Sequence, residues 1–154
     1  MRLQIGDPAP AFVGLTGDGK TIGLRDFAGK KLVLYFYPKD DTPGCTRQAC
    51  SLRDYNAQIK ERGAEILGVS TQDAASHERF SRKHRLNFPL LADADKAVSQ
   101  AYGAMGGGGL LGVAMDLLGL ARRITFIIDE QGRIAQIIDS PDCSNHAREV
   151  LGLL

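Results

Sequence analysis

Cys45 is the residue of this chain best suited to nucleophilic chemistry. It ends the segment Thr42-Pro43-Gly44-Cys45, which follows the apolar run 32–37. Threonine is a common helix N-cap and proline is favoured at the first helical position, so the spacing predicts a helix with Cys45 in its first turn. Unpaired backbone N–H groups and the positive end of the helix dipole would then face the sulfur. Both favour the thiolate over the thiol.

A second cysteine, Cys50, follows five positions later on the same predicted helix. On ideal helical geometry the two Cα atoms lie about 8 to 9 Å apart, whereas a disulfide usually needs less than roughly 7 Å. Five residues also turn the side chain about 140° past one full turn, so the two sulfurs point apart. A disulfide between them would require the helix to unwind at its start, where Pro43 and Gly44 make a turn easiest to lose.

Length, composition and charge narrow the class of protein. The 154 residues are 44% hydrophobic, which suits a single domain over residues 1–154. A formal net charge of +1 gives no electrostatic reason to bind nucleic acid or an anionic membrane. Three cysteines fit a reducing compartment better than a secreted disulfide scaffold. Residues 1–8 lack the apolar stretch of a signal peptide, so a cytoplasmic protein is expected.

Apolar periodicity and turn residues predict alternating strands and helices. We expect a hairpin between Leu15 and Leu24, strands over 31–37 and 64–70, helices over 43–62, 74–84, 95–102 and 144–153, and a second hairpin formed by 123–129 and 133–139. The reactive cysteine falls at the first strand-to-helix junction. This order predicts an α/β, thioredoxin-like fold with an N-terminal extension, in which helices flank a central mixed sheet.

The segment 35–46 (YFYPKDDTPGCT) closely resembles the active site of peroxiredoxins. The spacing of Cys45 and Cys50 is similar to that in the bacterioferritin comigratory protein branch, also called peroxiredoxin Q. The motif Pro-x-x-x-Thr-x-x-Cys is specific when a distant arginine precedes a strand, as Arg123 does here. The resemblance covers most of the chain and includes the segments 6–12, 67–70, 88–93, 123–129 and 144–146.

The resemblance implies reduction of hydroperoxides without a metal, heme or flavin cofactor. Cys45 would be the peroxidatic thiolate, which attacks a peroxide oxygen and becomes a sulfenic acid. Cys50 would be the resolving thiol, which forms an intramolecular disulfide with Cys45. A thioredoxin-like or glutaredoxin-like partner would then reduce that disulfide.

Three more residues take roles from the resemblance. Thr42 would accept hydrogen bonds from the helix N–H groups and donate its hydroxyl proton toward the peroxide and thiolate. Arg123 would place a permanent positive charge beside the sulfur and stabilise the departing oxygen. Pro38 would shield the pocket from water. Arg122 and Arg123 point opposite ways on a strand, so only one of them can face the site.

Two other functions compete with a thiol peroxidase. A thiol–disulfide oxidoreductase on the same fold normally uses Cys-x-x-Cys, whereas four residues separate the cysteines here. A non-enzymatic peroxide sensor shares the first chemical step, so the sequence leaves it open. Cys143 and His146 have the spacing of half a metal site, but no second pair follows, and neither zinc nor any other role is assigned to Cys143.

The remaining features receive plainer interpretations. His77 and His84 lie among charged residues and are expected on a solvated helix face. The glycine run 106–109 is interpreted as a mobile loop. The apolar segment 110–120 is expected to pack as a helix over the active site or to make a dimer contact. A monomer is the first expectation, with a dimer possible through residues 103–120.

Overall fold

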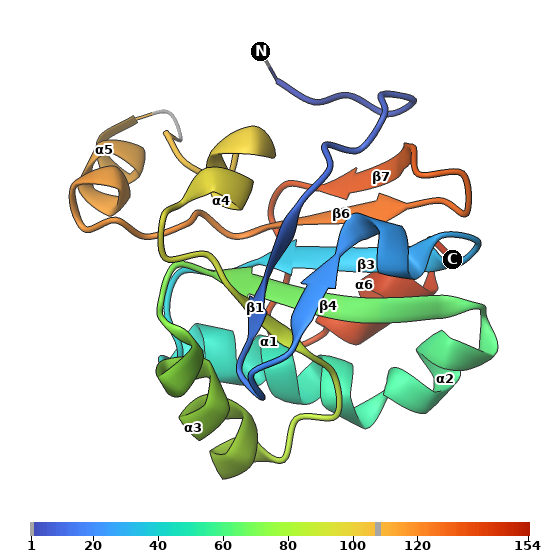
Figure 1. The fold of residues 1–154 in the computed structure, drawn as a ribbon, viewed down its shortest axis with the longest axis horizontal. Coiled ribbons are helices and arrows are strands. Elements are labelled where there is room, and N and C mark those ends of the chain that lie inside the picture. The colour runs from blue at the N-terminus through green and yellow to red at the C-terminus, as the bar shows by residue number, and fades with distance from the viewer. Residues whose placement is uncertain (1, 107–108) are drawn as a thin grey trace.

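The computed structural model of the chain describes residues 2–106 and 109–154. Within these residues one mixed sheet has seven strands in the order β2-β1-β5-β4-β3-β6-β7. The strands are β1 (Val13–Thr16), β2 (Thr21–Gly23), β3 (Lys31–Phe36), β4 (Ala64–Ser70), β5 (Leu90–Ala92), β6 (Ile124–Ile128) and β7 (Ile134–Ile138). Figure 1 shows helices on both faces of this sheet, which confirms the predicted architecture.

The helices lie between and after the strands along the chain. They are α1 (Pro43–Asp54), α2 (Asn56–Glu61), α3 (Ala74–His84), α4 (Ala97–Ala101), α5 (Gly109–Leu117) and α6 (His146–Leu151), with a short 3-10 helix at Leu24–Phe27. The predicted strand over 64–70 and helix over 74–84 match β4 and α3 at both ends. The N-terminal extension enters the main sheet, because β1 pairs antiparallel with both β2 and β5.

Strand β3 lies at the centre of the fold and separates two hydrophobic clusters. It runs parallel to β4 and antiparallel to β6, so Tyr35 is paired with Gly68 on one side and with Thr125 on the other. Alternate residues of a strand face opposite sides of a sheet. Leu34 therefore packs with α4 and the N-terminal segment, whereas Tyr35 packs with α1, α2, α3 and α6. Cys45 belongs to the second cluster.

The predicted single helix over 43–62 is wrong, because the chain forms α1 and α2 with a break at Tyr55. The break has a polar cause on the neighbouring loop. The Asn87 side-chain amide donates to the Arg53 carbonyl at 3.1 Å, and Asn56 donates back to Asn87 at 3.1 Å. The Arg53 carbonyl thus has a hydrogen-bond partner outside the helix, and the backbone can leave helical geometry at Tyr55.

The apolar segment after the glycine run forms the predicted helix, α5, but leaves its leucines uncovered. Its side chains Leu110, Leu111, Leu117 and Leu118 are between 72% and 88% exposed. The loop predicted at 106–109 lies partly outside the described residues. In the described ranges, no helix has both the length and the apolar character needed to cross a membrane.

The first testable prediction concerns Gly68, where β4 packs closely against its neighbours. A Cβ on Gly68 would lie 2.7 Å from Leu90 Cδ2 and 2.9 Å from Tyr35 Cε1. Because these atoms belong to the packed core, Gly68→Ala should lower the free energy of unfolding by about 1 to 3 kcal/mol. Urea unfolding followed by circular dichroism measures this. The matched control is Gly152→Ala, whose new Cβ meets only ordinary contacts of 3.5 Å or more, and equal stability of both variants would contradict the packing argument.

Candidate active site

The thiol of Cys45 lies at the start of α1, as the sequence predicts. Pro43 is the first residue of the helix, and the first intrahelical hydrogen bond runs from the Thr46 N–H to the Thr42 carbonyl at 2.8 Å. The N–H groups of Gly44 and Cys45 precede that bond and have no intrahelical partner. Cys45 itself is only 1% exposed. The positive end of the helix dipole faces this sulfur and favours a negative charge there, whereas burial removes the hydration of such a charge.

Arg123 supplies the cation of the site. Its Nη2 donates to Cys45 Sγ at 3.3 Å, and its Nη1 donates to Gln48 Oε1 at 2.7 Å. The residue directly precedes β6, which pairs with β3, so the sheet brings Arg123 to Cys45 across 78 positions of sequence. Arg122 turns the other way and contacts the Gly103 carbonyl and Asp139. The prediction that only one of the two arginines faces the site is confirmed.

Gln48 is a site residue that the sequence reasoning missed. It is fully buried, and its Oε1 accepts from Nη1 of Arg123, next to the Nη2 that contacts the sulfur. Its own Nε2 has no hydrogen-bond partner among the described residues. The signal was present in the spacing, because residue 48 follows residue 45 by three positions and so lies on the same helix face.

The predicted capping contact of Thr42 is wrong. Its backbone occupies the N-cap position, but its side chain makes no cap hydrogen bond. The hydroxyl instead donates to the Lys39 carbonyl at 2.8 Å, which lies on the loop just before the helix. The hydroxyl proton thus points to a carbonyl three residues back, so the expected donation of this proton toward the peroxide and thiolate is also not made in this structure. The oxygen lone pairs of Thr42 thus stay available as acceptors beside the helix start.

Pro38 is partly buried at the end of β3 and is fixed through its carbonyl. That carbonyl accepts hydrogen bonds from Ser70 Oγ at 3.2 Å and from Gln72 Nε2 at 3.1 Å. Both donors come from the end of β4 and the residues that follow it. The role of Pro38 in excluding water remains a prediction.

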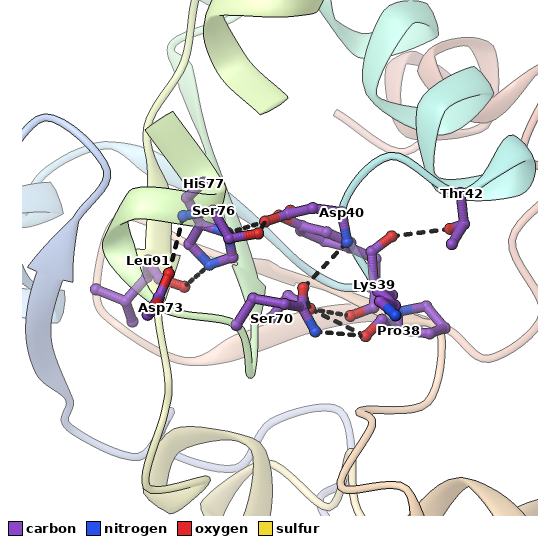
Figure 2. A network of polar contacts seen from close by, with 11 residues as sticks. Pro38, Lys39, Asp40, Thr42, Ser70, Asp73, Ser76, His77 and Leu91 are labelled. Atoms are coloured by element: carbon purple, nitrogen blue, oxygen red, sulfur yellow. Dashed lines mark hydrogen bonds and ion pairs between the residues drawn. The ribbon is translucent and has the colours of Figure 1, made fainter. Parts of the chain in front are cut away.

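The sequence predicts His77 and His84 on a solvated helix face. This prediction is wrong for His77, whose side chain is fully buried. Its Nδ1 lies 2.6 Å from Asp40 Oδ2 and its Nε2 lies 3.0 Å from the Leu91 carbonyl (Figure 2). The neighbouring charges concealed that His77 precedes the buried Phe80 by three residues and shares its helix face. His84 is partly exposed and contacts Asp41 at 3.1 Å.

The three cysteines are free thiols. Cys50 is half-buried on α1. Cys143 is also half-buried, and it borders the site, which the sequence did not indicate. A Cβ on Gly44 would lie 3.7 Å from Cys143 Sγ and 3.2 Å from Arg123 Nη2. Across the part of the chain that the structure describes, no group of three or more His, Cys, Asp or Glu side chains is placed to hold a metal ion.

Three titratable side chains near the thiol, Tyr35, Tyr37 and His146, are neutral. Burial raises the pKa of the Tyr35 and Tyr37 phenols well above the usual value. Burial also lowers the pKa of His146, although the Glu149 carboxylate opposes this. A neutral His146 that donates through Nδ1 to Glu149 accepts through Nε2 from the Thr125 hydroxyl at 2.9 Å. Arg123 is therefore the cation that faces the sulfur.

A buried thiol at a helix start, hydrogen-bonded to a guanidinium on a thioredoxin-like fold, defines a thiol-based redox enzyme. The AhpC/TSA family model matches residues 5–137. Peroxiredoxin Bcp of Escherichia coli is 41% identical over 152 residues, covering 99% of this chain and 96% of that protein. The chain belongs to the AhpC/TSA family and, within it, to the peroxiredoxins of the Bcp and Q type, which are thiol-dependent peroxidases.

Solved structures agree with this assignment. A cysteine-to-serine mutant of PrxQ from Xylella fastidiosa has a TM-score of 0.88 at 29% identity, covering 99% of this chain and 95% of that one. The bacterioferritin comigratory protein of Xanthomonas campestris, studied for its alkyl peroxide reduction activity, has a TM-score of 0.82 at 33% identity. The match covers 92% of this chain and 88% of that one.

The contact between Gln48 and Arg123 makes the second prediction. Gln48→Leu removes the acceptor that orients the guanidinium, so hydrogen peroxide should oxidise Cys45 about tenfold more slowly or worse, the loss expected for one charged hydrogen bond. Gln48→Glu keeps an acceptor but adds a negative charge close to the thiolate, so its oxidation should also be slower than in the wild type. Stopped-flow mixing of the reduced enzyme with peroxide measures both. Gln58→Leu, at an exposed position of α2, is the matched control, and a wild-type rate in Gln48→Leu would show that Arg123 is oriented without Gln48.

Proposed function

We propose that this enzyme reduces hydrogen peroxide and organic hydroperoxides through a sulfenic acid on Cys45, which Cys50 resolves as an intramolecular disulfide. One observation carries the proposal: Arg123 Nη2 lies 3.3 Å from a buried Cys45 sulfur at the first turn of α1. The reported alkyl peroxide reduction of the Xanthomonas campestris protein supports the inclusion of organic hydroperoxides.

The first step is a displacement at oxygen. The Cys45 thiolate attacks the terminal peroxide oxygen, an S–O bond forms, and the O–O bond breaks. Cys45 is oxidised to the sulfenic acid, and the other oxygen leaves as water or an alcohol after taking up a proton. Arg123 hydrogen-bonds to the sulfur before the attack and can stabilise the charge that develops on the leaving oxygen. Pro38 and Thr42 bound the space beside the sulfur in this proposal.

The second step needs a local change of conformation. The thiol of Cys50 attacks the sulfenic sulfur, a disulfide forms, and water leaves. Because helical geometry holds the two cysteines too far apart, the first turn of α1 must unwind before they react. Pro43 and Gly44 weaken that turn. Resolution is therefore expected to be slower than the first oxidation.

A thioredoxin-type or glutaredoxin-type protein would complete the cycle by reducing the disulfide. We assign the whole chain, residues 1–154, to one catalytic domain and place it in the cytoplasm, where such reductants keep thiols reduced. No metal, heme or flavin takes part in the proposed cycle. The rival function is a peroxide sensor that signals through the same disulfide, and many rapid turnovers with a thioredoxin system would exclude that function.

The third prediction assigns the thiols. Cys45→Ser should abolish peroxide consumption. Cys50→Ser should still form the sulfenic acid at the wild-type rate but should not be recycled by thioredoxin. Quenched samples with blocked thiols, analysed by peptide mass mapping, identify each oxidised species.

Cys143→Ser is the control for that experiment, because Cys143 is half-buried as Cys50 is and lies beside Gly44. It should cycle normally. Normal recycling of Cys50→Ser together with a Cys45–Cys143 disulfide would transfer the resolving role to Cys143.

The fourth prediction concerns assembly. We propose a monomer, because both thiols of the cycle lie on one chain. The exposed leucines of α5 and the residue after it would form the contact if two copies paired. Sedimentation velocity across a hundredfold range of protein concentration should give one species of monomer mass. A dimer that is lost in the double variant Leu110→Ser/Leu117→Ser would contradict the monomer and place the interface on α5.

A further inference from the structure

The strongest feature outside the reacting thiols is the buried pair of Asp40 and His77. His77 has no exposed surface, and Asp40 is 8% exposed. Asp40 lies on the loop between β3 and α1, five residues before the reactive cysteine, whereas His77 lies on α3. Figure 2 shows the two side chains pointing toward each other across the space between these elements.

The partners of His77 fix its protonation. Nε2 lies 3.0 Å from the Leu91 carbonyl, which can only accept, so Nε2 carries a proton. Nδ1 lies 2.6 Å from Asp40 Oδ2. That carboxylate already accepts from the Tyr37 hydroxyl at 2.6 Å and from Ser76 Oγ at 2.7 Å. A carboxylate with two hydroxyl donors is stabilised in its charged form, so the third contact is a donation from Nδ1 of an imidazolium.

The titration of Asp40 agrees with this arrangement. Burial alone raises the pKa of Asp40, but the hydrogen bond and charge of His77, together with the two hydroxyl donors, outweigh burial and hold the pKa below its usual value. The pair is therefore a buried ion pair with every oxygen and nitrogen satisfied. Such a pair adds little net stability compared with an apolar pair of the same volume, but it fixes geometry.

The pair fixes the geometry of the loop that leads from β3 into the first turn of α1, where Cys45 lies. The Asp40 N–H donates to Gln72 Oε1 at 3.0 Å, and Gln72 Nε2 donates to the Pro38 carbonyl at 3.1 Å. Ser70 Oγ donates to the Tyr37 carbonyl at 2.7 Å. The loop is thus attached to β4 and α3 by side chains, whereas the helix start that follows it begins with Pro43 and Gly44.

We propose that Asp40 and His77 are positioning residues of the peroxidase reaction, whose buried ion pair holds residues 38–42 in place beside Cys45. The attachment ends before the turn that must unwind, so the pair accelerates the attack on peroxide and leaves formation of the disulfide unaffected. This inference rests on the proposed function. Loss of the pair should therefore slow the oxidation of Cys45 by peroxide without slowing formation of the disulfide.

The test uses Asp40→Asn in the full chain. Asparagine has the same shape, can accept from Tyr37, and can donate to an unprotonated Nδ1, but these neutral hydrogen bonds hold the loop less strongly than the charge-assisted contacts they replace. We expect the second-order rate constant for Cys45 oxidation by hydrogen peroxide to fall about ten- to a hundredfold, the cost of a small misplacement of reacting groups. The rate of disulfide formation should change less than about twofold. Ser76→Ala, which removes one donor to the carboxylate, should lower the oxidation rate less and in the same direction.

His84→Gln is the matched control, because His84 lies on the same helix and contacts the adjacent Asp41 at an exposed position. Both of its rates should stay within about twofold of wild type. Nitrogen NMR of the His77 ring at pH 7 tests the ion pair itself, whereas slower oxidation with unchanged disulfide formation is the readout that a merely structural role would not give. Nδ1 and Nε2 should both be protonated in the wild type, and only Nε2 in Asp40→Asn.

Two results would overturn the proposal: an unprotonated Nδ1 in the wild type, or oxidation of Cys45 at the wild-type rate in Asp40→Asn and Ser76→Ala. A loss of thermal stability with unchanged oxidation would likewise reduce the pair to a structural role. These failures differ from failure of the proposed function, which would appear as peroxide consumption by Cys45→Ser. If Asp40→Asn does not fold, Ser76→Ala and the wild-type NMR measurement still decide the question.

Discussion

The hydrogen bond from Arg123 to the sulfur of Cys45 is the interaction on which the rest of the site depends. A buried thiolate loses its hydration, and a guanidinium 3.3 Å away replaces part of it. The contact exists only if β3 and β6 pair in the observed antiparallel register, because each strand positions one partner at its end. The central sheet therefore brings together two segments that are far apart in the sequence. Gln48 accepts a hydrogen bond from the guanidinium and orients it.

The surroundings of Cys45 differ in how firmly they are held. On one side, the loop from Tyr37 to Thr42 is bonded to α3 and to the end of β4 through side chains that leave no side-chain oxygen or nitrogen of Asp40 or His77 without a partner. On the other side, α1 begins with a proline and a glycine and gains nothing from a capping side chain. A fixed pocket next to a weak helix start suits a reaction whose first step needs order and whose second step needs unwinding.

The surface of the molecule contains two features that the catalytic cycle does not require. Cys143 borders the same glycine as Arg123 does, so its thiol is close enough to the site to compete with Cys50 if the helix start moves. The helix α5 exposes leucines on a chain with almost no net charge. Both features lie outside the segments 6–12, 35–46, 67–70, 88–93, 123–129 and 144–146, on which the resemblance to the family rests.

The sequence by itself determined the elements and the reacting thiol. Local signals were sufficient there: Pro43 and Gly44 mark a helix start, alternation marks a buried strand, and the spacing of Cys45 from that strand marks the site. Only the tertiary structure decided the partners. The Asn87 side chain bonds to the Arg53 carbonyl where the predicted long helix breaks, the Lys39 carbonyl accepts from the Thr42 hydroxyl, and Asp40 pairs with the buried His77. Each of these contacts joins polar groups that become neighbours only after folding. The charged residues next to His77 in the sequence suggested an exposed side chain. The Asp40 carboxylate that makes its burial possible lies 37 positions away, outside any short stretch of sequence around His77.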